Sequence, residues 1–476
     1  MGDLASLILA SSWGALGKDA AKEFRDWIAK ARIYAYANSM TDASTIYALS
    51  SAPGRAGVAV IRLSGPAARD ALARMVKGPP KPRYAAFRTV RHPTTGEALD
   101  GAVVIWFEAS SSETGEDVVE FQIHGSRAAI AAVLSALGEI AGCRLAEPGE
   151  FVRRAFENGK LDLAQVEGLA DFVEAETEAQ RRQALTQVGG VLSKLYDGWR
   201  TRLIEIAALT EAAIDFADEG DVSASSLAEA RKRASVLAAE IAVHLDDKHR
   251  GEIVREGFRV ALLGAPNAGK SSLLNALARR DAAIVSAEAG TTRDVIEVRL
   301  DLAGLPVIVS DTAGIREAAS DIEREGIRRS LVAAREADLI IWLTETDDSN
   351  LPCGISRETS LVIRSKADLA PDSRSGGFAV SAVTGEGLDR LIEGITQRAK
   401  QVVGDRTDPV LTQARHRQSL EDAVRDIETF LNEDSAAIEL RAEDVRRAAH
   451  AIGRITGRVD VEDVLDQIFS RFCIGK

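Results

Sequence analysis

Cysteine is scarce in this sequence. The three cysteines, Cys143, Cys353 and Cys473, are far apart and form no CxxC pair. An odd and scattered set of cysteines supports neither a disulfide framework nor a zinc site. We therefore expect a protein of the reducing cytoplasm.

Long apolar runs are missing near the start of the chain. Residues 4–17 form the longest uncharged stretch there, which is too short to span a bilayer, and Asp3 stands where a signal peptide would carry basic residues. We expect no signal peptide and no membrane span. Residues 1–39 precede Met40 and are interpreted as a loose extension or an over-called start; their acidic residues argue against a transit peptide.

Basic residues are outnumbered. The sequence has 59 lysines and arginines against 72 aspartates and glutamates, a formal net charge of −13. Proteins that coat nucleic acid non-specifically need an excess of cations, so this class is excluded and any RNA contact must be local. With 46% hydrophobic residues, the 476-residue chain has material for about two to four domains, which excludes global disorder.

Proline is confined to parts of the chain. None occurs between Pro148 and Pro266 or after Pro409, and both proline-free blocks have apolar residues at helical spacing. We therefore predict one helical domain that is interrupted by an inserted domain. The residues that carry the helical pattern are Leu195, Trp199, Leu203 and Ile206 in the first block and Val461, Val464, Leu465, Ile468, Phe469 and Phe472 in the second.

Strand patterns predict the other two domains. The inserted block alternates apolar strands with helical stretches, which indicates an α/β fold with a mainly parallel sheet. The segment before the helical block has three strands and a helix from Ser126, typical of an α+β domain. Predicted strands are 58–63, 103–107 and 118–123 in the first domain and 260–263, 307–310, 339–343, 361–363 and 378–380 in the inserted one. The expected domains are 40–157 (N-terminal), 158–254 and 403–476 (helical) and 255–402 (inserted).

Residues 264–271, Gly-Ala-Pro-Asn-Ala-Gly-Lys-Ser, follow a predicted strand and precede a helical stretch. In this context they form a P-loop, whose backbone N–H groups surround phosphates at a helix N-terminus. Lys270 is expected to reach the β and γ oxygens and to assist catalysis, and the Ser271 hydroxyl to bind Mg²⁺. A chance glycine turn is the alternative interpretation.

Two further elements argue against a chance match. Residues 311–314, Asp-Thr-Ala-Gly, end the next apolar strand, where an acid holds Mg²⁺ through water and a glycine N–H senses the γ-phosphate. Thr291 and Thr292 lie between these elements and supply a switch threonine.

Two motifs at strand ends predict which base is bound. Residues 365–368, Ser-Lys-Ala-Asp, and the pair Ser381-Ala382 resemble the guanine motifs of the GTPase superfamily. The Asp368 carboxylate accepts from both N–H groups of guanine and disfavours adenine, a discrimination that reaches about 10⁴-fold. Ser365 stands where that superfamily has asparagine, so guanine affinity is expected to be weaker. The residues expected to contact GTP are Asn267, Ala268, Gly269, Lys270, Ser271, Ser272, Ser286, Thr291, Thr292, Asp311, Thr312, Ala313, Gly314, Ser365, Lys366, Asp368, Ser381 and Ala382.

The glutamine that orients water in Ras-like enzymes is absent, because Ile315 follows Gly314. A carboxylate and a cation near the phosphates are expected to take its place. Asn267 is a candidate oxygen ligand for such a cation. Candidate acids are Glu317, Asp321, Glu323 and Glu325, although composition alone favours a solvated helix face for them.

From about residue 40 to its end, the chain resembles the MnmE (TrmE) family of tRNA uridine-modification GTPases. The resemblance rests on residues 53–57 (PGRAG), 114–117 (TGED), 148–165 (from PGEF to LDLAQ) and 473–476 (CIGK) as well as on the nucleotide motifs. It implies an N-terminal domain that binds a tetrahydrofolate derivative and forms a homodimer, and a G domain inserted into a helical domain. It also implies an FAD-containing partner, MnmG, with which the protein modifies the wobble uridine of tRNA at C5.

The resemblance also implies roles for single residues. Family ligands for K⁺ fall on Asn267, Ser286, Glu288 and Thr291, and those for Mg²⁺ on Ser271 and Thr292. The catalytic glutamate falls on Glu323, the folate contacts on Arg62, Glu120, Lys160 and Lys476, and Cys473 is a further candidate catalytic residue.

The residues themselves leave some of these roles open. Glu120 alternates with Val119 and Phe121 along its strand, so its carboxylate need not enter the core. Arg62 shares a strand face with Val58 and Val60, and without the resemblance it is interpreted as an edge residue whose charged end reaches solvent. Cys473 is likewise interpreted as an inert terminal thiol unless the resemblance is considered. A second function is also open: an RNA-binding switch GTPase in ribosome assembly, which needs neither the folate-type domain nor Cys473.

Overall fold

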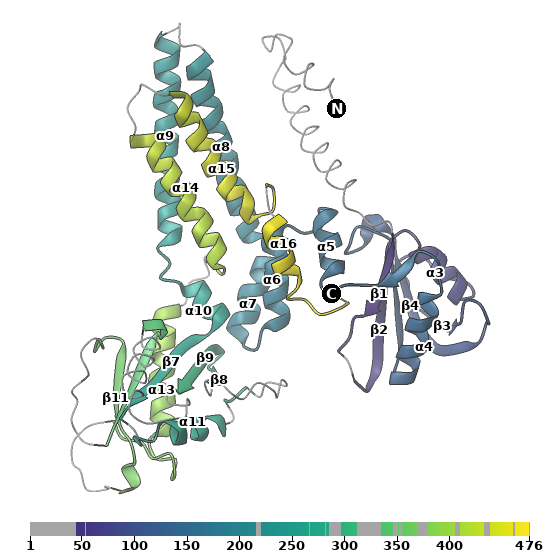
Figure 1. The fold of residues 1–476 in the computed structure, drawn as a ribbon, viewed down its shortest axis with the longest axis horizontal. Helices are drawn as coiled ribbons and strands as arrows, with labels where there is room; N and C mark the ends of the chain where they lie inside the picture. The colour runs from purple at the N-terminus through teal and green to yellow at the C-terminus, as the bar shows by residue number, and fades with distance from the viewer. Residues whose placement is uncertain are drawn as a thin grey trace, which may run out of the picture. The chain divides into compact units, whose positions relative to one another are not determined.

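The computed structural model describes residues 44–52, 54–215, 220–265, 267–280, 282–284, 297–311, 335–345, 351, 355–369, 378–404, 410–432, 438–459 and 462–475 (Figure 1). The chain divides into two compact units. The N-terminal unit comprises residues up to 161 together with 465–476, and the central unit comprises residues 162–464. No helix in the described part of the chain has the length and apolar character needed to cross a bilayer.

A six-stranded sheet of order β3-β4-β5-β2-β1-β6 forms the N-terminal unit. The pairs are antiparallel except for β1 and β6, and Leu63, Phe121 and Leu72 are buried between one sheet face and the helices. The three predicted strands and the helix capped by Ser126 are present. The elements are β1 Thr45–Leu49, β2 Ala56–Ser64, α3 Ala68–Met75, β3 Ala86–Arg91, β4 Ala98–Phe107, η2 Ala109–Ser111, β5 Val118–Gly125, α4 Arg127–Gly138, β6 Cys143–Leu145 and α5 Glu150–Glu157.

Strand pairing decides the position of Arg62. Strand β2 lies between β5 and β1, so the interpretation of Arg62 as a residue of an edge strand is wrong. The register places Arg62 directly opposite Glu120. Glu120 alternates with the buried Val119 and Phe121, as the sequence pattern predicted. The two charged side chains therefore share the sheet face opposite the main core.

The inserted domain contains a five-stranded sheet of order β11-β10-β7-β9-β8. Strands β7, β9, β10 and β11 pair in parallel, whereas β8 is antiparallel to β9. The predicted strand 378–380 is reduced to a single bridge between Ala379 and Arg364. The elements are β7 Phe258–Gly264, α11 Lys270–Ala278, β8 Glu297–Leu302, β9 Leu305–Asp311, β10 Leu339–Thr344, β11 Ser360–Arg364, η3 Ala367–Leu369 and α13 Leu388–Val403.

The helical domain takes its core from both sides of the insertion. Trp199 and Leu203 of one segment share a buried cluster with Leu420 and Ile452 of the other. Burying these apolar faces against each other stabilises helices that would be marginal alone. The helices are α6 Leu163–Glu174, α7 Glu178–Val188, α8 Val191–Asp215, α9 Gly220–Leu245 and α10 Arg250–Glu256 before the insertion, and α14 Ala414–Asn432 and α15 Ile438–Ile455 after it.

The chain enters and leaves the inserted domain at one place. A Cβ on Gly251 of α10 would lie 2.1 Å from the carbonyl oxygen of Leu411, so the two backbones touch. Arg417 at the start of α14 pairs with Glu252 of α10 at 3.0 Å and with Asp247 at 2.7 Å. Contacts of this kind fix both connections of the insertion to each other.

The last helix, α16 (Glu462–Phe469), contributes to the N-terminal unit from Leu465 onward. Leu465, Ile468, Phe469 and Phe472 are buried, as their helical spacing predicted, whereas Val461 lies outside the described residues. The C-terminal segment is therefore held by an apolar face.

Candidate functional site

The P-loop lies between β7 and α11 and depends on glycine. Gly264 has φ +153°, and a Cβ there would lie 2.4 Å from the Leu343 carbonyl oxygen on the neighbouring strand. Gly269 (φ +89°) and Asn267 (φ +66°) also take left-handed conformations. This path brings the loop to the N-terminus of α11, where backbone N–H groups favour phosphate.

Lys270 and Ser271 begin α11. The Lys270 ammonium donates to the carbonyl oxygens of Gly264 at 2.8 Å and Ala265 at 2.9 Å and is largely buried. Burial lowers the pKa of Lys270, and the nearby Asp311 acts in the opposite direction. The Ser271 hydroxyl donates to Asp311 Oδ2 at 2.6 Å. Two oxygen groups expected at a Mg²⁺ site therefore meet, and hard oxygen ligands are those that Mg²⁺ prefers.

The two predicted guanine motifs meet at the ends of β11 and the following segment. Ser381 Oγ donates to Asp368 Oδ1 at 2.6 Å and accepts from the backbone N–H groups of Val383 and Thr384. The Ala367 N–H donates to the Val380 carbonyl oxygen at 3.1 Å. Asp368 is thus fixed by the second motif.

Ser365 connects this region to the P-loop. Its backbone N–H and its hydroxyl both donate to the Thr344 carbonyl oxygen, at 2.8 and 3.3 Å, and a Cβ on Gly269 would lie 3.9 Å from Ser365 Cβ. Ser365, which replaces the asparagine of the superfamily, therefore forms its hydrogen bonds with the end of β10. Lys366 pairs with Glu345 at 2.5 Å.

The other predicted nucleotide residues divide into two groups. Ala268 is buried in the loop, Ser272 is exposed on α11, and Ala382 is half-buried beside Ser381. Those outside the described residues are Ser286, Glu288, Thr291, Thr292, Thr312, Ala313, Gly314, Glu323 and, at the chain end, Lys476, together with Ile315, Glu317, Asp321 and Glu325.

A second candidate site lies on the N-terminal sheet. Arg62 donates to Glu120 Oε1 at 3.2 Å and to Glu113 Oε2 at 3.0 Å, and its guanidinium carbon lies 6.0 Å from the centre of the Phe151 ring. Lys160, the other described candidate, donates to the Ser110 carbonyl oxygen at 3.1 Å. The structure pairs Arg62 with Glu120, whereas Lys160 donates to a residue of η2.

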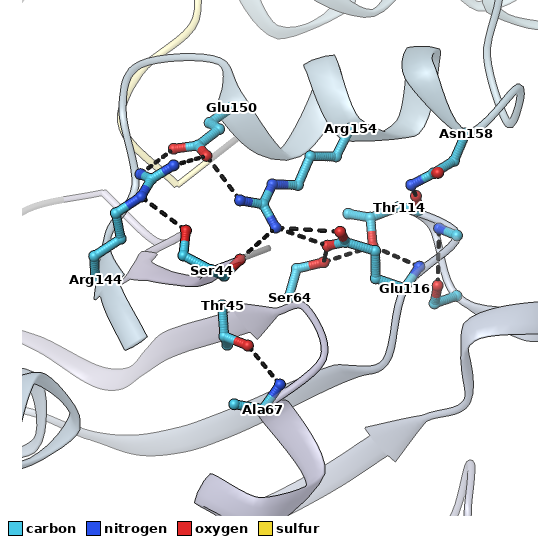
Figure 2. Close-up of polar contacts among 12 residues, drawn as sticks. Ser44, Thr45, Ser64, Ala67, Thr114, Glu116, Arg144, Glu150, Arg154 and Asn158 are labelled. Carbon is cyan, nitrogen blue, oxygen red and sulfur yellow. Dashed lines mark hydrogen bonds and ion pairs between the residues drawn. The ribbon is translucent and has the colours of Figure 1, made fainter. Parts of the chain in front are cut away.

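Beside this pair lies an ionic network that the sequence did not predict (Figure 2). Arg154 of α5 donates to Glu116 at 3.1 Å and to Glu150 at 3.0 Å, and Arg144 donates to Glu150 at 2.6 Å. Ser64 at the end of β2 donates to Glu116 at 2.7 Å. Burial alone would raise the pKa of Glu150, but bonds from Arg144, the Glu147 backbone and Arg154 hold it below its usual value.

This network explains two of the sequence motifs. Glu116 belongs to residues 114–117, and Glu150 to the run that begins at Pro148. Asn158 at the end of α5 donates to the Thr114 carbonyl oxygen at 2.7 Å. The motifs therefore attach α5 to the sheet beside the strand that carries Arg62.

The C-terminal segment lies against the same unit. Ile474 forms an antiparallel bridge with Pro148, and a Cβ on Gly475 (φ +99°) would lie 2.3 Å from the Leu49 carbonyl oxygen. A Cβ on Gly149 would likewise lie 2.3 Å from the Phe469 carbonyl oxygen. Cys473 is exposed between these fixed points. The segment is positioned by its backbone, and its thiol faces solvent.

Comparison with known proteins covers both units. Residues 45–160 match the family model described as the GTP-binding protein TrmE N-terminus, and residues 163–473 match the model described as the MnmE helical domain. Three relatives are each named tRNA modification GTPase MnmE. The chain is 54% identical over 438 residues to the Parvibaculum lavamentivorans protein, with 91% of this chain and 100% of that protein covered. It is 49% identical over 445 residues to the Methylorubrum populi protein and 48% over 452 residues to the Caulobacter vibrioides protein, each with 92% of this chain and 100% of the relative covered.

Proposed function

Because this chain belongs to the MnmE family of tRNA modification GTPases, we propose that it hydrolyses GTP to drive modification of the wobble uridine of tRNA at C5. One observation carries this proposal: the same chain has both a P-loop with paired guanine motifs and an N-terminal unit of the TrmE type. A ribosome-assembly switch needs only the first of these. The protein acts in the cytoplasm with an FAD-containing partner of the MnmG type, as homodimers joined into a heterotetramer.

Analysis of tRNA from a deletion strain tests this function. Wobble uridines should lack the C5 substituent, and the intact gene should restore it. A strain that carries only Lys270→Ala should stay unmodified, because the Lys270 ammonium is proposed to neutralise charge on the β and γ oxygens of GTP. Normal wobble uridines together with defective ribosomal subunits in the deletion strain would favour the switch GTPase.

The central unit supplies the groups for hydrolysis. Lys270 neutralises charge on the β and γ oxygens, and Ser271 with Asp311 fits Mg²⁺, which adds positive charge at those oxygens when bound. Thr292 is proposed as the second protein ligand of Mg²⁺, and Glu323 as the group that orients water. Asp368 reads the base.

Hydrolysis should be faster in potassium than in sodium. Asn267 holds a left-handed position in the P-loop, and its amide oxygen is proposed as a K⁺ ligand with Ser286, Glu288 and Thr291. A cation there does the work of an arginine finger, which is typically worth about 10³ to 10⁵ in rate. Phosphate release should be compared in KCl and NaCl at equal ionic strength. Asn267→Ala should remove most of the difference, and equal rates for the intact protein in the two salts would contradict the proposal.

The N-terminal unit is proposed to hold the tetrahydrofolate that supplies the one-carbon unit. Glu120 is half-buried, and its carboxylate accepts from the N–H groups of a pterin edge, while Arg62, Lys160 and Lys476 suit the acidic tail. The network around Arg154 supports this role because it fixes α5 beside β2.

Glu120→Ala should weaken binding of 5-formyltetrahydrofolate by roughly tenfold or more, since a hydrogen bond to a charged group is worth about 1.5 to 3 kcal/mol. Calorimetry on the purified protein measures this, and GTP hydrolysis should be unchanged. Glu113→Ala is the matched control, because Glu113 pairs with the same arginine but has a side chain that is 55% exposed. Equal folate affinity in both variants would remove Glu120 from the site.

The homodimer is proposed to form through the N-terminal unit. Val58 of β2 is 57% exposed on the sheet, which leaves apolar surface uncovered. Such surface on a sheet face favours burial against a second copy.

A further inference from the structure

A basic segment crosses the N-terminal unit of this acidic protein. Between Asp70 and Glu97 the sequence has no acidic residue, although the chain as a whole has a net charge of −13. The lysines and arginines in this interval are Arg74, Lys77, Lys81, Arg83, Arg88 and Arg91. We call residues 76–91 the β3 basic loop.

The β3 basic loop has a fixed shape. Val76 and Val90 close it as an antiparallel bridge, and the Arg83 N–H donates to the Trp106 carbonyl oxygen at 2.7 Å. Arg88 Nε donates to the Gly78 carbonyl oxygen at 2.9 Å across the loop. Its final strand, β3, is an edge of the six-stranded sheet. The basic side chains therefore project from a loop whose backbone conformation is fixed by hydrogen bonds.

Most basic side chains of this loop are not neutralised by an acidic partner among the described residues. Lys77, Lys81 and Arg83 are exposed, and among the described residues none of them forms an ion pair. Within the described part of the chain, Arg88 donates to two carbonyl oxygens, those of Gly78 and Phe87. Because carbonyl groups carry no net charge, the loop keeps a concentrated positive charge.

Two aromatic side chains accompany these cations. Tyr84 and Phe87 are 67% and 69% exposed. The tip of the Phe87 ring points at Gly101 of β4, where a Cβ would lie 2.8 Å from Phe87 Cζ, so the missing side chain makes room for it. The ring is held at its tip by the sheet while the residue stays largely in solvent.

We propose that the β3 basic loop contacts tRNA, with its lysines and arginines on phosphates and with Tyr84 and Phe87 as stacking platforms for unpaired bases. Exposed cations interleaved with aromatic rings suit single-stranded RNA, whose bases stack on aromatic side chains. Two copies of so basic a loop repel each other, which disfavours the loop as a contact between protomers. This inference rests on the proposed tRNA modification and names a surface for its substrate.

The test is tRNA binding by the full-length protein, measured by fluorescence anisotropy from 50 to 300 mM salt. Lys77→Glu/Lys81→Glu should bind roughly tenfold more weakly at the lower salt concentrations and reduce the salt slope by about two, because phosphate contacts release counterions. Tyr84→Ala/Phe87→Ala should lower affinity but leave the slope unchanged. Lys232→Glu/Arg425→Glu, on the central unit, is the control with the same charge change.

The possible outcomes distinguish failure of this inference from failure of the function on which it rests. Wild-type affinity in both loop variants would overturn the inference, and wobble modification by the same variants would show that the proposed function stands. A change in sedimentation with unchanged tRNA affinity would assign the loop to a protein contact and also overturn it. Weaker binding with wild-type GTP hydrolysis and sedimentation supports it.

Discussion

Asp368→Asn should change the preferred nucleotide from GTP to XTP. We propose that the carboxylate of Asp368 accepts from two N–H groups of guanine, whereas an asparagine amide would offer a donor to the carbonyl oxygen that xanthine carries in place of the amino group. A buried polar group left without its partner penalises the wrong base, and discrimination of this kind reaches about 10⁴ to 10⁵. We expect kcat/KM for GTP to fall by roughly 10³ or more and activity to return with XTP.

The contacts of Asp368 make this exchange tolerable for the fold. Its Oδ1 accepts a hydrogen bond from Ser381 Oγ, and the asparagine carbonyl oxygen accepts the same bond. Recovery of hydrolysis with XTP is therefore an internal control for folding. Lys366→Ala is a comparison from the same motif and should not create a preference for XTP. A variant that retains its GTP preference would show that Asp368 does not read the base.

Removal of residues 473–476 should abolish tRNA modification and leave GTP hydrolysis nearly intact. The segment touches the N-terminal unit at Ile474 and Gly475, while the P-loop and the guanine motifs belong to the central unit. The buried Phe472 precedes the deletion, so the apolar anchor of the segment is retained. Mass spectrometry of tRNA nucleosides and phosphate release measure the two activities.

Single substitutions distinguish a chemical role of the Cys473 thiol from a role of the segment in backbone contacts. Cys473→Ser keeps the backbone contacts and should be as inactive in modification as the deletion if the thiol takes part in the reaction. Ile474→Ala is the control, because the isoleucine side chain is 56% exposed and its backbone forms the bridge. Full modification by the truncated protein would assign no role to this tail.

Structural features that depend on a few consecutive residues were the ones best predicted from the sequence. The P-loop was evident because a left-handed turn needs glycine and phosphate needs a lysine beside it, and both requirements fall within residues 264–271. Ser271 and Asp311 were each predicted to serve the same Mg²⁺, and the structure brings the two side chains into contact.

Contacts between distant residues were not predictable from the sequence. The Arg154–Glu116 pair joins residues 38 positions apart, and no period or spacing marks them as partners. Arg62 was misplaced for a related reason, since alternation gives the face of a strand but not its place in the sheet. The antiparallel edge strand β8 was not predicted either, because its pairing with β9 depends on the sheet rather than on its six residues alone.

The shared helical core also governs the order in which the protein is completed during synthesis. Arg417 bonds the Leu245 carbonyl oxygen across 172 residues of sequence, so the ribosome must translate the whole inserted domain before α14 exists. At about 5 to 20 residues per second, this delay is on the order of 10 to 30 seconds. During that interval Trp199, Leu203 and Ile206 on α8 can pack against α9 but lack the residues of α14 and α15 that complete their buried cluster. We therefore expect a chaperone to bind the nascent helical segment until α14 and α15 emerge.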